Sequence, residues 1–262
     1  CLSDCATGLM GHSKNKLVLL PGLFDVNECD SISGLYGEAD IFRSHVQMVR
    51  HGFGRGEYRY FSYPLPSIIE IARSALYSHL VSIANSWSER MGTDIKFPEK
   101  HDVFLQQCHE SGQVKPTPLL LEYRSGDYNC LHQDIYGEQV FPIQVAVLLS
   151  EPDTDFTGGE FVLTEQRPRM QSRAAVVPLR KGDGVIFAVN NRPNRGTKGD
   201  YRVTMRHGVS SVRSGIRHTL GLIFSRCNMI CLRMKEDGLN LVQERPFLMV
   251  LQKIYLTNFF KK

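Results

Sequence analysis

The sequence predicts an α+β protein that is mainly β, with a sandwich or barrel core in its second half and supporting helices in its first half. Before residue 116 the clearest pattern is helical. After residue 116, short runs rich in branched and aromatic residues follow one another between turn signals. No long helical pattern interrupts those runs, which argues against a parallel sheet built from βαβ units.

The first half of the chain is predicted to begin with a short strand and a helix. Residues 17–24 are apolar and are broken by a Pro-Gly turn. Asp25 or Asn27 is a suitable N-cap for a helix that stops at Gly37. The aromatic and basic residues 41–63 are predicted to form a loop and a strand.

Two further helices are predicted before residue 116. The clearer one runs from Ser67 to Arg90, because its apolar residues recur three or four positions apart on one face. Those residues are Ile68, Ile69, Ala72, Leu76, Leu80, Ile83 and Trp87. Prolines precede this helix and a glycine follows it, as is usual at helix boundaries. The other helix lies within residues 98–112 and ends near Gly112.

Seven β-rich runs follow, each short enough for a strand of a sandwich or barrel. They cover residues 118–123, 141–150, 159–165, 174–179, 184–189, 201–209 and 217–224. Turn signals fall between them at residues 125–126, 158–159, 181–183 and 194–196. The last stretch, residues 227–262, is predicted to be an appendage with one or two helices packed on the outside.

Composition is that of a globular protein and excludes several classes. The 262 residues are 42% hydrophobic and 22% charged, and no apolar run approaches the length of a membrane span, so no membrane partner is expected. The first sixteen residues lack the apolar region of a signal peptide. Seven cysteines without a Cys-x-x-Cys pair favour a reducing compartment. We therefore expect a cytoplasmic protein, or a nuclear one in a eukaryote, that is not secreted.

One tripeptide, His132-Gln133-Asp134, raises the question of a metal site. Alone it fits either half of a metal site or two polar residues at a strand end. In a strand, residues two apart point to the same face, so both side chains can reach one ion. His207, near the end of a later predicted strand, is the candidate third ligand. Two histidines and one carboxylate form the facial triad of non-haem Fe(II) oxygenases, with three positions left open.

An arginine stands where a cosubstrate would bind such a site. Arg217 follows His207 by ten residues, and Thr219 shares its face of the predicted strand. A buried arginine pairs well with a carboxylate, and 2-oxoglutarate would offer one end to iron and the other to Arg217. Tyr123, nine residues before His132, is placed to add a hydroxyl.

These residues resemble those of a known family. The stretch "YRSGDYNCLHQD" with His207 and Arg217 is similar to the Fe(II)/2-oxoglutarate-dependent dioxygenases. The runs "TGGEFVLTE" and "LRKGDGVIF" resemble strands of prolyl-hydroxylase-type members, and the first stretch also resembles AlkB-type demethylases. A denser likeness, over "DYNCLHQDIYGEQVFPIQVAVLLSEPDTDFTGGEFVLTEQRPRMQSRA" and "RHGVSSVRSGIRHTLGLIF", is to oxygenases described as acting in oxidative demethylation of damaged DNA.

The resemblance implies a fold, a division of the chain and a set of roles. The fold is a double-stranded β-helix, or jelly roll, with N-terminal helices. Residues 1–115 would form a helical buttressing region, 116–224 the dioxygenase domain and 225–262 a C-terminal tail without an assigned role. The metal ligands would be His132, Asp134 and His207, and the cofactor-binding residues would be Arg217, Tyr123 and Thr219.

The implied reaction uses Fe(II), 2-oxoglutarate and O2, with ascorbate as a possible reductant. Its substrate would be an alkylated base in DNA or RNA, which loses its methyl group after hydroxylation. A protein substrate, hydroxylated at proline, is the alternative, and a non-catalytic module that binds metal and 2-oxoglutarate is a third reading.

Ten basic residues lie between Arg167 and Arg206, against only two acidic ones, Asp183 and Asp200. They form either a solvated face or a phosphate-binding rim. Arg213 would touch substrate or lie in a solvated turn.

Overall fold

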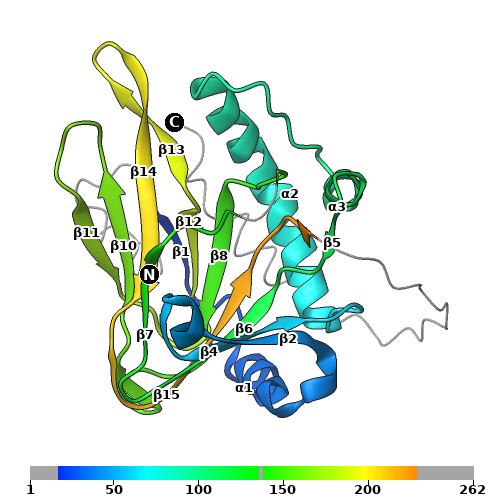
Figure 1. The fold of residues 1–262 in the computed structure, drawn as a ribbon, viewed down its shortest axis with the longest axis vertical. Coiled ribbons are helices and arrows are strands. Elements are labelled where there is room, and N and C mark those ends of the chain that lie inside the picture. The colour runs from blue at the N-terminus through cyan, green and yellow to red at the C-terminus, as the bar shows by residue number, and fades with distance from the viewer. Residues whose placement is uncertain (1–16, 136–137, 229–262) are drawn as a thin grey trace, which may run out of the picture.

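Two antiparallel sheets packed face to face form the centre of the molecule (Figure 1). The computed structural model describes residues 17–135 and 138–228. The large sheet runs in the order β1 (Leu17–Leu20), β12 (Gly184–Ala188), β8 (Ile143–Leu148), β15 (Val212–Leu222), β6 (Leu119–Arg124), β4 (Glu57–Phe61) and β2 (Phe42–Gln47), and β9 (Phe156–Gly158) pairs with β15. The small sheet runs β11 (Arg173–Val177), β10 (Phe161–Gln166), β14 (Gly199–Val209), β7 (Tyr128–His132) and β3 (Gly54–Arg55), with β13 (Asn191–Gly196) paired to β14.

The chain passes back and forth between the two sheets in the manner of a jelly roll. Strands β6, β8, β12 and β15 lie in the large sheet, whereas β7, β10, β11 and β14 lie in the small one. Among these eight strands, the only pair consecutive along the sequence that stays in one sheet is the hairpin β10–β11. This order is that of a double-stranded β-helix, and it confirms the predicted fold class.

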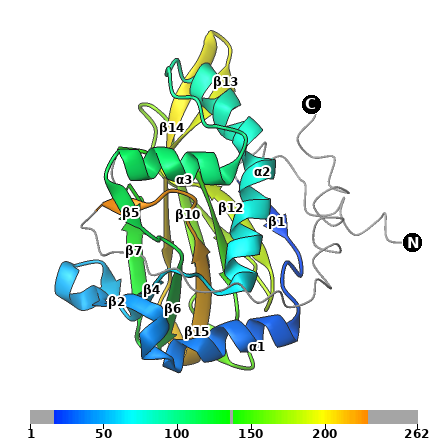
Figure 2. The ribbon, with the colours of Figure 1, turned by 90° about the vertical axis from the view of Figure 1, so that its right-hand side faces the viewer.

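Helices cover the outer face of the large sheet (Figures 1 and 2). They are α1 (Val26–Gly34), α2 (Ser67–Arg90) and α3 (His101–Glu110), with short 3-10 turns η1 (Leu35–Gly37) and η2 (Ala39–Ile41). A third turn, η3 (Met48–His51), packs instead against the core between the sheets through Met48. The two-residue strand β16 (Cys227–Asn228) pairs with β5 (Gln113–Lys115) beside α3. None of these helices, in the part of the chain that the structure describes, is long and apolar enough to cross a membrane.

The apolar residues form two main cores. One lies between the large sheet and the helices, where the buried face of α2, including Ile69, Leu76 and Leu80, packs with residues of the sheet. The other lies between the two sheets and includes Tyr123, Phe161, Phe187 and Val209. The second core forms the walls of the cavity described below.

Most predicted elements are present, with three corrections. Helix α2 has the predicted bounds, and Asp25 caps α1 through a capping box with Glu28. Residues 41–63, predicted as a loop and one strand, form β2, β3 and β4. The predicted turn at residues 194–196 is the end of β13, and α3 is shorter than the predicted span of 98–112.

The N-terminal part of the chain supplies strands as well as helices. Strand β1 extends the large sheet at one edge by pairing with β12. Strands β4 and β2 extend the sheet beyond β6 at the other edge. Of the predicted C-terminal appendage, residues 229–262 lie outside the described residues.

Candidate functional site

The three predicted metal ligands meet between the two sheets. His132 is the last residue of β7, His207 lies on β14, and the two are directly paired across the strands. Asp134 follows two residues after β7. One ligand atom from each of the three residues lies within 4.8 Å of the others. Among the described residues, no other group of histidine, cysteine, aspartate or glutamate has this geometry.

Distances within this trio fit a single metal ion. Asp134 places Oδ1 3.4 Å from Nε2 of His132 and Oδ2 3.4 Å from Nε2 of His207. Metal–ligand bonds of about 2.1 Å place adjacent ligands about 3 Å apart, so a small closure around an ion would suffice. Nδ1 of His132 donates a hydrogen bond to the Cys130 carbonyl at 2.8 Å, which leaves Nε2 of the neutral ring free to bind a metal.

The route by which Asp134 reaches the site differs from the prediction. A continuous strand was expected to carry both His132 and Asp134, but β7 ends at His132 and Asp134 lies in the following loop. Gln133 anchors that loop, because its amide donates to Asn190 Oδ1 at 2.7 Å and to the Met205 carbonyl at 2.8 Å. The loop, rather than strand alternation, therefore positions the carboxylate.

A bulge in β7 turns a further residue into the cavity. His132 pairs with His207 and Asn129 pairs with Val209, so two residues of β7 stand opposite the single residue Gly208. Both Asn129 and His132 therefore line the cavity although they are three positions apart. Asn129 Nδ2 donates to the Tyr123 hydroxyl at 3.2 Å. Sequence reasoning missed Asn129 because alternation places it on the opposite face from His132.

Electrostatics keep the carboxylate of the trio ionised. Burial acts to raise the pKa of Asp134, but the hydrogen bonds and charges that the protonated rings of His132 and His207 supply without a metal outweigh it and hold the pKa well below its usual value. Burial lowers the pKa of His207, which favours the neutral imidazole that binds metals. At His132, burial is opposed by the hydrogen bond and charge of Asp134, and the pKa is raised.

Arg217 lies in the same cavity as a buried cation. Its side chain is on β15, is 1% exposed, and donates from Nη1 to the Thr219 hydroxyl. The guanidinium carbon lies 5.6 Å from the ring centre of Tyr123, which pairs with Arg217 across β6 and β15. Burial lowers the pKa of Arg217 to about 10. Arg217 forms no ion pair with any of the described residues, and its Nε has no hydrogen-bond partner among them.

Two glycines bring the chain close over Arg217. Gly158 and Gly159 have φ values of 73° and 61°, the left-handed region that glycine adopts without strain. A Cβ atom added at Gly159 would lie 2.9 Å from Cδ of Arg217 and 2.9 Å from Cγ2 of Val212. The paired glycines of the "TGGE" stretch therefore allow the β9–β10 connection to pack against the arginine.

The cavity that holds these groups has a volume of about 230 Å³. All six predicted site residues line it, with polar groups from Tyr58, Asn129, Gln133 and Gln144. Its apolar walls come from both sheets and from η3: Met48, Phe53, Leu119, Leu121, Ile135, Val145, Ala146, Phe161, Phe187 and Val209. Met48, Phe53 and Tyr58 were not predicted as site residues. They lie in residues 41–63, which were predicted as a loop and one strand and form three strands.

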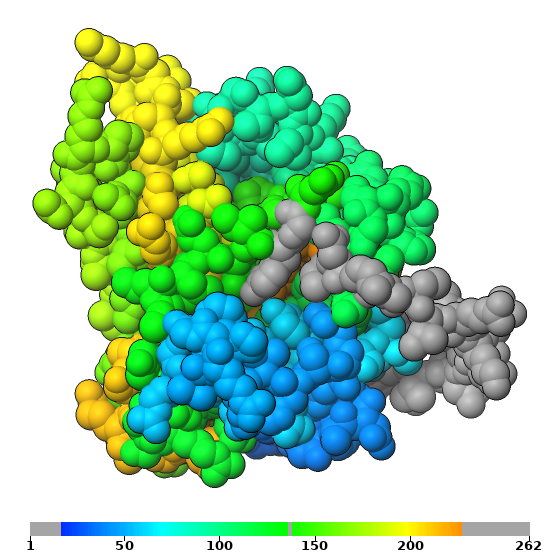
Figure 3. Space-filling model, in the orientation of Figure 1, coloured from blue at the N-terminus to red at the C-terminus, as the bar shows by residue number. Residues whose placement is uncertain are grey.

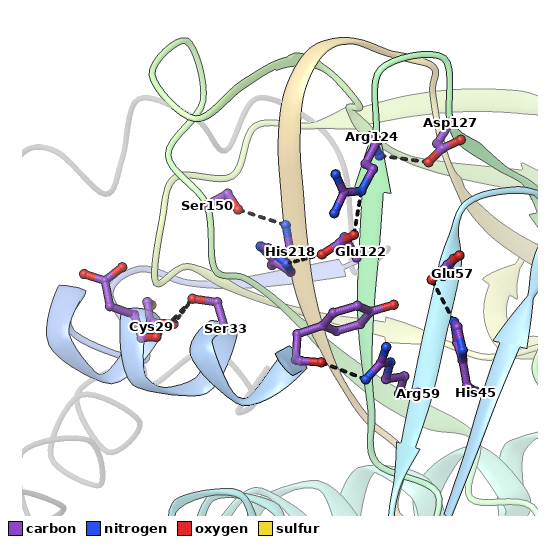
Figure 4. Close-up of polar contacts among 12 residues, drawn as sticks. Cys29, Ser33, His45, Glu57, Arg59, Glu122, Arg124, Asp127, Ser150 and His218 are labelled. Atoms are coloured by element: carbon purple, nitrogen blue, oxygen red, sulfur yellow. Dashed lines mark hydrogen bonds and ion pairs between the residues drawn. The ribbon is translucent and has the colours of Figure 1, made fainter. Parts of the chain in front are cut away.

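The outer face of the large sheet carries a separate polar cluster (Figure 4). His218 lies next to Arg217 in β15 but faces away from the cavity, as alternation predicts, and its Nε2 lies 3.1 Å from Glu122. Glu122 also accepts from Arg124, and Glu57 pairs with His45 at 2.7 Å. A hollow of about 510 Å³ lies here, but its two carboxylates already have cationic or imidazole partners.

The predicted basic rim divides into paired and unpaired residues. Arg192 is buried against Glu165 at 2.6 Å, Arg167 also bonds Glu165, and Arg195 lies 3.5 Å from Asp200. The side chain of Arg213 is 69% exposed and lies 3.7 Å from Glu160. Of the ten basic residues counted between Arg167 and Arg206, four therefore form ion pairs with carboxylates of the protein, and the other six form none with the described residues.

Comparison with known proteins identifies relatives over most of the chain. Residues 56–227 match the Oxygenase-NA family, described as "oxygenase, catalysing oxidative methylation of damaged DNA". Uncharacterised proteins from two strains of Mycobacterium tuberculosis, CDC 1551 and H37Rv, are each 44% identical over 194 residues. Those alignments cover 74% of this chain and 78% of each relative. The family match spans the strands from β4 to β15 and leaves out β1, β2 and β3.

Solved structures with lower similarity also match. A prolyl hydroxylase from Trichoplax adhaerens, in complex with a peptide of hypoxia inducible factor, has a TM-score of 0.48 and 14% identity, over 79% of this chain and 82% of that one. An oxidoreductase of the 2OG-Fe(II) oxygenase family from Burkholderia pseudomallei has a TM-score of 0.45 and 17% identity, over 79% and 83%.

Proposed function

Since the chain belongs to the Oxygenase-NA family it is an oxygenase, and we propose that it is an Fe(II)- and 2-oxoglutarate-dependent dioxygenase that demethylates alkylated bases in nucleic acid. The oxygenase activity follows from membership of the family. The cosubstrate, the metal and the substrate are our proposals, and each has its own support.

Arg217 is the observation that carries the cosubstrate proposal. Its guanidinium is 1% exposed and has no carboxylate partner among the described residues. Burying a charge in this way costs free energy unless a ligand supplies an anion. The cavity that holds it also holds the three candidate metal ligands. A small dicarboxylate with a keto group fits both features, because one end can bind a metal while the far carboxylate accepts from Arg217 and Thr219.

Iron is the metal that this donor set favours. His132, Asp134 and His207 would hold it on one face, which leaves positions for the cosubstrate and O2. When bound, ferrous iron supplies the activation of O2 that no amino-acid side chain provides. The protein's own residues do the rest. Arg217 orients the cosubstrate, Gln133 anchors the loop that carries Asp134, and the apolar walls exclude water from the reacting groups.

The reaction that we propose is oxidation of a methyl group on an alkylated nucleic-acid base. An oxygenase inserts oxygen into a carbon–hydrogen bond and does not add methyl groups, so we interpret the family description as oxidation of a methyl group already present. One O2 and one 2-oxoglutarate would give succinate and CO2 and convert N–CH3 to N–CH2OH. The hydroxymethyl group would then leave as formaldehyde and restore the N–H of the base.

The test compares substrates of two classes. Succinate and formaldehyde are measured with Fe(II), 2-oxoglutarate and either N-methylated oligonucleotides or proline-containing peptides. We expect formaldehyde only with the oligonucleotides. Product from the peptides alone would replace nucleic acid with protein as the substrate, and the absence of succinate under every condition would leave a non-catalytic binding module.

A pair of variants ties the reaction to the metal site. Asp134→Ala removes the carboxylate between the two histidines and is expected to abolish succinate formation. Asp94→Ala changes an exposed carboxylate that is not part of the cavity lining and should leave the rate unchanged. Equal activity of Asp134→Ala and the native protein would refute the assignment of the metal site.

A further inference from the structure

An exposed pair of aromatic rings stands at the edge of the metal cavity. Phe53 is 49% exposed, and its ring stacks on His51 with the centroids 5.4 Å apart and an angle of 24° between the planes. Val49, in the same segment, is 66% exposed. Leaving an apolar ring half exposed to water is unfavourable. Such a ring at the edge of a cavity therefore often marks a site where a ligand covers it.

Strand pairing fixes this segment beside the metal ligands. The amide of Cys130 donates to the Phe53 carbonyl at 2.9 Å, and Arg55 pairs with Tyr128 where β3 meets β7. Phe53 is therefore held next to Cys130, two residues before His132. Phe53 also lines the cavity that contains His132 and Asp134. In Figure 3, the blue segment that includes η3 and β3 lies on the face turned to the viewer, beside green atoms of the second quarter of the chain.

The same segment carries unpaired positive charge. Between Met48 and Gly56 there are two arginines and a histidine but no acidic residue. Arg50 and Arg55 are both exposed, and neither forms an ion pair within residues 17–135 and 138–228. They differ in this from Arg167 and Arg195, whose guanidinium groups bind carboxylates of the protein. Arginines without ion pairs, placed before and after an exposed ring in the sequence, favour the binding of an anionic polymer that carries aromatic groups.

We propose that the η3–β3 segment is a docking surface for single-stranded nucleic acid, with a base on the Phe53–His51 stack and phosphates at Arg50 and Arg55. This inference rests on the proposed function and adds where and how the strand is held. Sequence-tolerant binding of single strands combines stacking on aromatic side chains with cations that follow the phosphates. The target base would enter the cavity while a neighbouring base stacks on Phe53.

Variants of Phe53 test the stacking contact. Phe53→Leu keeps apolar area but removes the ring face, and Phe53→Trp keeps a ring. We expect Phe53→Leu to raise KM for a methylated single-stranded oligonucleotide by about 10- to 100-fold, from the usual strength of base stacking, with little change in kcat. Phe53→Trp should restore a KM near the native value. A Phe53→Leu enzyme with native KM would overturn the stacking proposal.

Salt dependence tests the two arginines. Binding of a fluorescein-labelled unmethylated twelve-nucleotide strand is measured between 50 and 300 mM KCl. Arg50→Ala and Arg55→Ala should each weaken binding and lower the slope of log K against log salt by about 0.7, because each removes a phosphate contact to a single strand. Arg169→Ala is the matched control, since Arg169 is exposed and has no ion pair within the described chain. If only Arg169→Ala changed the slope, the phosphates would lie on the β10–β11 loop and the docking surface would be wrong.

Failure of this inference can be distinguished from failure of the proposed function. Succinate formed from 2-oxoglutarate without substrate reports the metal site alone, and it should be the same in the native protein, in Arg50→Ala and in Arg55→Ala, whose side chains do not line the cavity. If the native enzyme formed succinate but bound acidic peptides rather than oligonucleotides, both the nucleic-acid substrate and this docking surface would be refuted. If it demethylated oligonucleotides while Phe53→Leu, Arg50→Ala and Arg55→Ala all matched it in KM and in binding, the surface alone would be refuted.

Discussion

At the residue scale, Arg217 and His218 show how one strand serves two faces of a sheet. Arg217 points into the cavity and bonds Thr219, whereas His218 points outward to Glu122 (Figure 4). The outward pair is satisfied within the protein. The inward arginine has no carboxylate partner in the described chain, so a ligand anion would interact with it strongly.

Arg217→Gln should weaken the use of 2-oxoglutarate. The change removes a buried charge that would bind the far carboxylate, and hydrogen bonds to charged groups contribute about 1.5 to 3 kcal/mol. We expect KM for 2-oxoglutarate to rise by about 10- to 100-fold, measured as succinate formed at varied cosubstrate. His218→Gln alters the adjacent residue on the other face and should leave this KM unchanged. A native KM in Arg217→Gln would contradict the role given to the arginine.

Gly159→Ala should disturb Arg217 indirectly. The added Cβ would lie 2.9 Å from Cδ of the arginine, and φ at this position is 61°. Gly92→Ala is a close control, because its φ is 65° but no atom lies within 4 Å of the added Cβ. Gly92→Ala should lose about 1 to 2 kcal/mol of stability in urea titration from the left-handed backbone. Gly159→Ala should lose more, because its Cβ also meets Arg217 and Val212. Only Gly159→Ala should also raise KM for 2-oxoglutarate, and an equal KM in the two variants would argue against contact with the arginine.

Several site residues could be predicted from sequence because period-two alternation holds along their strands. Arg217 and Thr219 share the inner face of β15, and Tyr123 pairs with Arg217 from β6. Asp134 was expected on the strand but is placed by a loop whose hydrogen bonds involve distant residues. Asn129 could not be predicted, because nothing in the local sequence of β7 indicates a bulge.

At the element scale, the β7 bulge is the feature that shapes the metal site. It places His132 opposite His207 and also turns Asn129 toward Tyr123. Gly208 stands opposite the two bulge residues Cys130 and Leu131, where the β7 backbone approaches closely. Bulges often occur next to active sites because they re-aim a side chain without ending the strand pair.

Gly208→Ala should therefore weaken metal binding. The added Cβ would lie 2.7 Å from the Asn129 carbonyl oxygen and 3.1 Å from that of Cys130, so β7 would have to move. We expect affinity for Fe(II), measured by anaerobic titration calorimetry, to fall by about 10-fold or more, as when groups that support metal ligands are altered. Gly34→Ala, at the end of α1 with open space around its Cβ, is the control. Unchanged affinity in Gly208→Ala would show that the bulge tolerates the methyl group.

The missed strands have a physical explanation. In β2 none of the six residues is buried, and in β4 the burial does not alternate. A strand without one exposed and one buried face shows no period-two alternation of apolar and polar residues. Residues 41–63 were therefore predicted as a loop and one strand, although they form β2, β3 and β4. By contrast α2 has one continuous apolar face, and its bounds agree with the prediction. The sheet edges, which build part of the cavity wall, were therefore the least predictable part of the fold.

At the scale of the whole molecule, buried polar groups join the helices to the jelly roll. Arg73 of α2 is 1% exposed and donates to the carbonyls of Ile223, Phe224 and Ser225, just past the end of β15. His101, at the start of α3, is held at the same place, because its Nε2 lies 3.0 Å from the Phe224 carbonyl and its Nδ1 lies 3.3 Å from Ser74 Oγ. A neutral His101 satisfies both contacts by donating to the carbonyl and accepting from the hydroxyl.

This junction should make the fold sensitive to acid. Burial, aided by the charge of Arg73, lowers the pKa of His101 to about 3, against 6.5 for the unperturbed side chain. Between these values the unfolded chain binds the proton that the folded chain excludes. The contribution of His101 to the free energy of unfolding is therefore complete above pH 6.5 and falls by about 1.4 kcal/mol per pH unit as the pH drops toward 3.

His101→Gln keeps a donor and an acceptor without a titrating group. When the metal-free proteins are unfolded in urea at pH 7 and at pH 5, the variant should therefore lose less stability between the two pH values than the native protein. His109→Gln, on the exposed side of α3, should retain the native slope, and a native slope in His101→Gln would show that other groups govern the acid response.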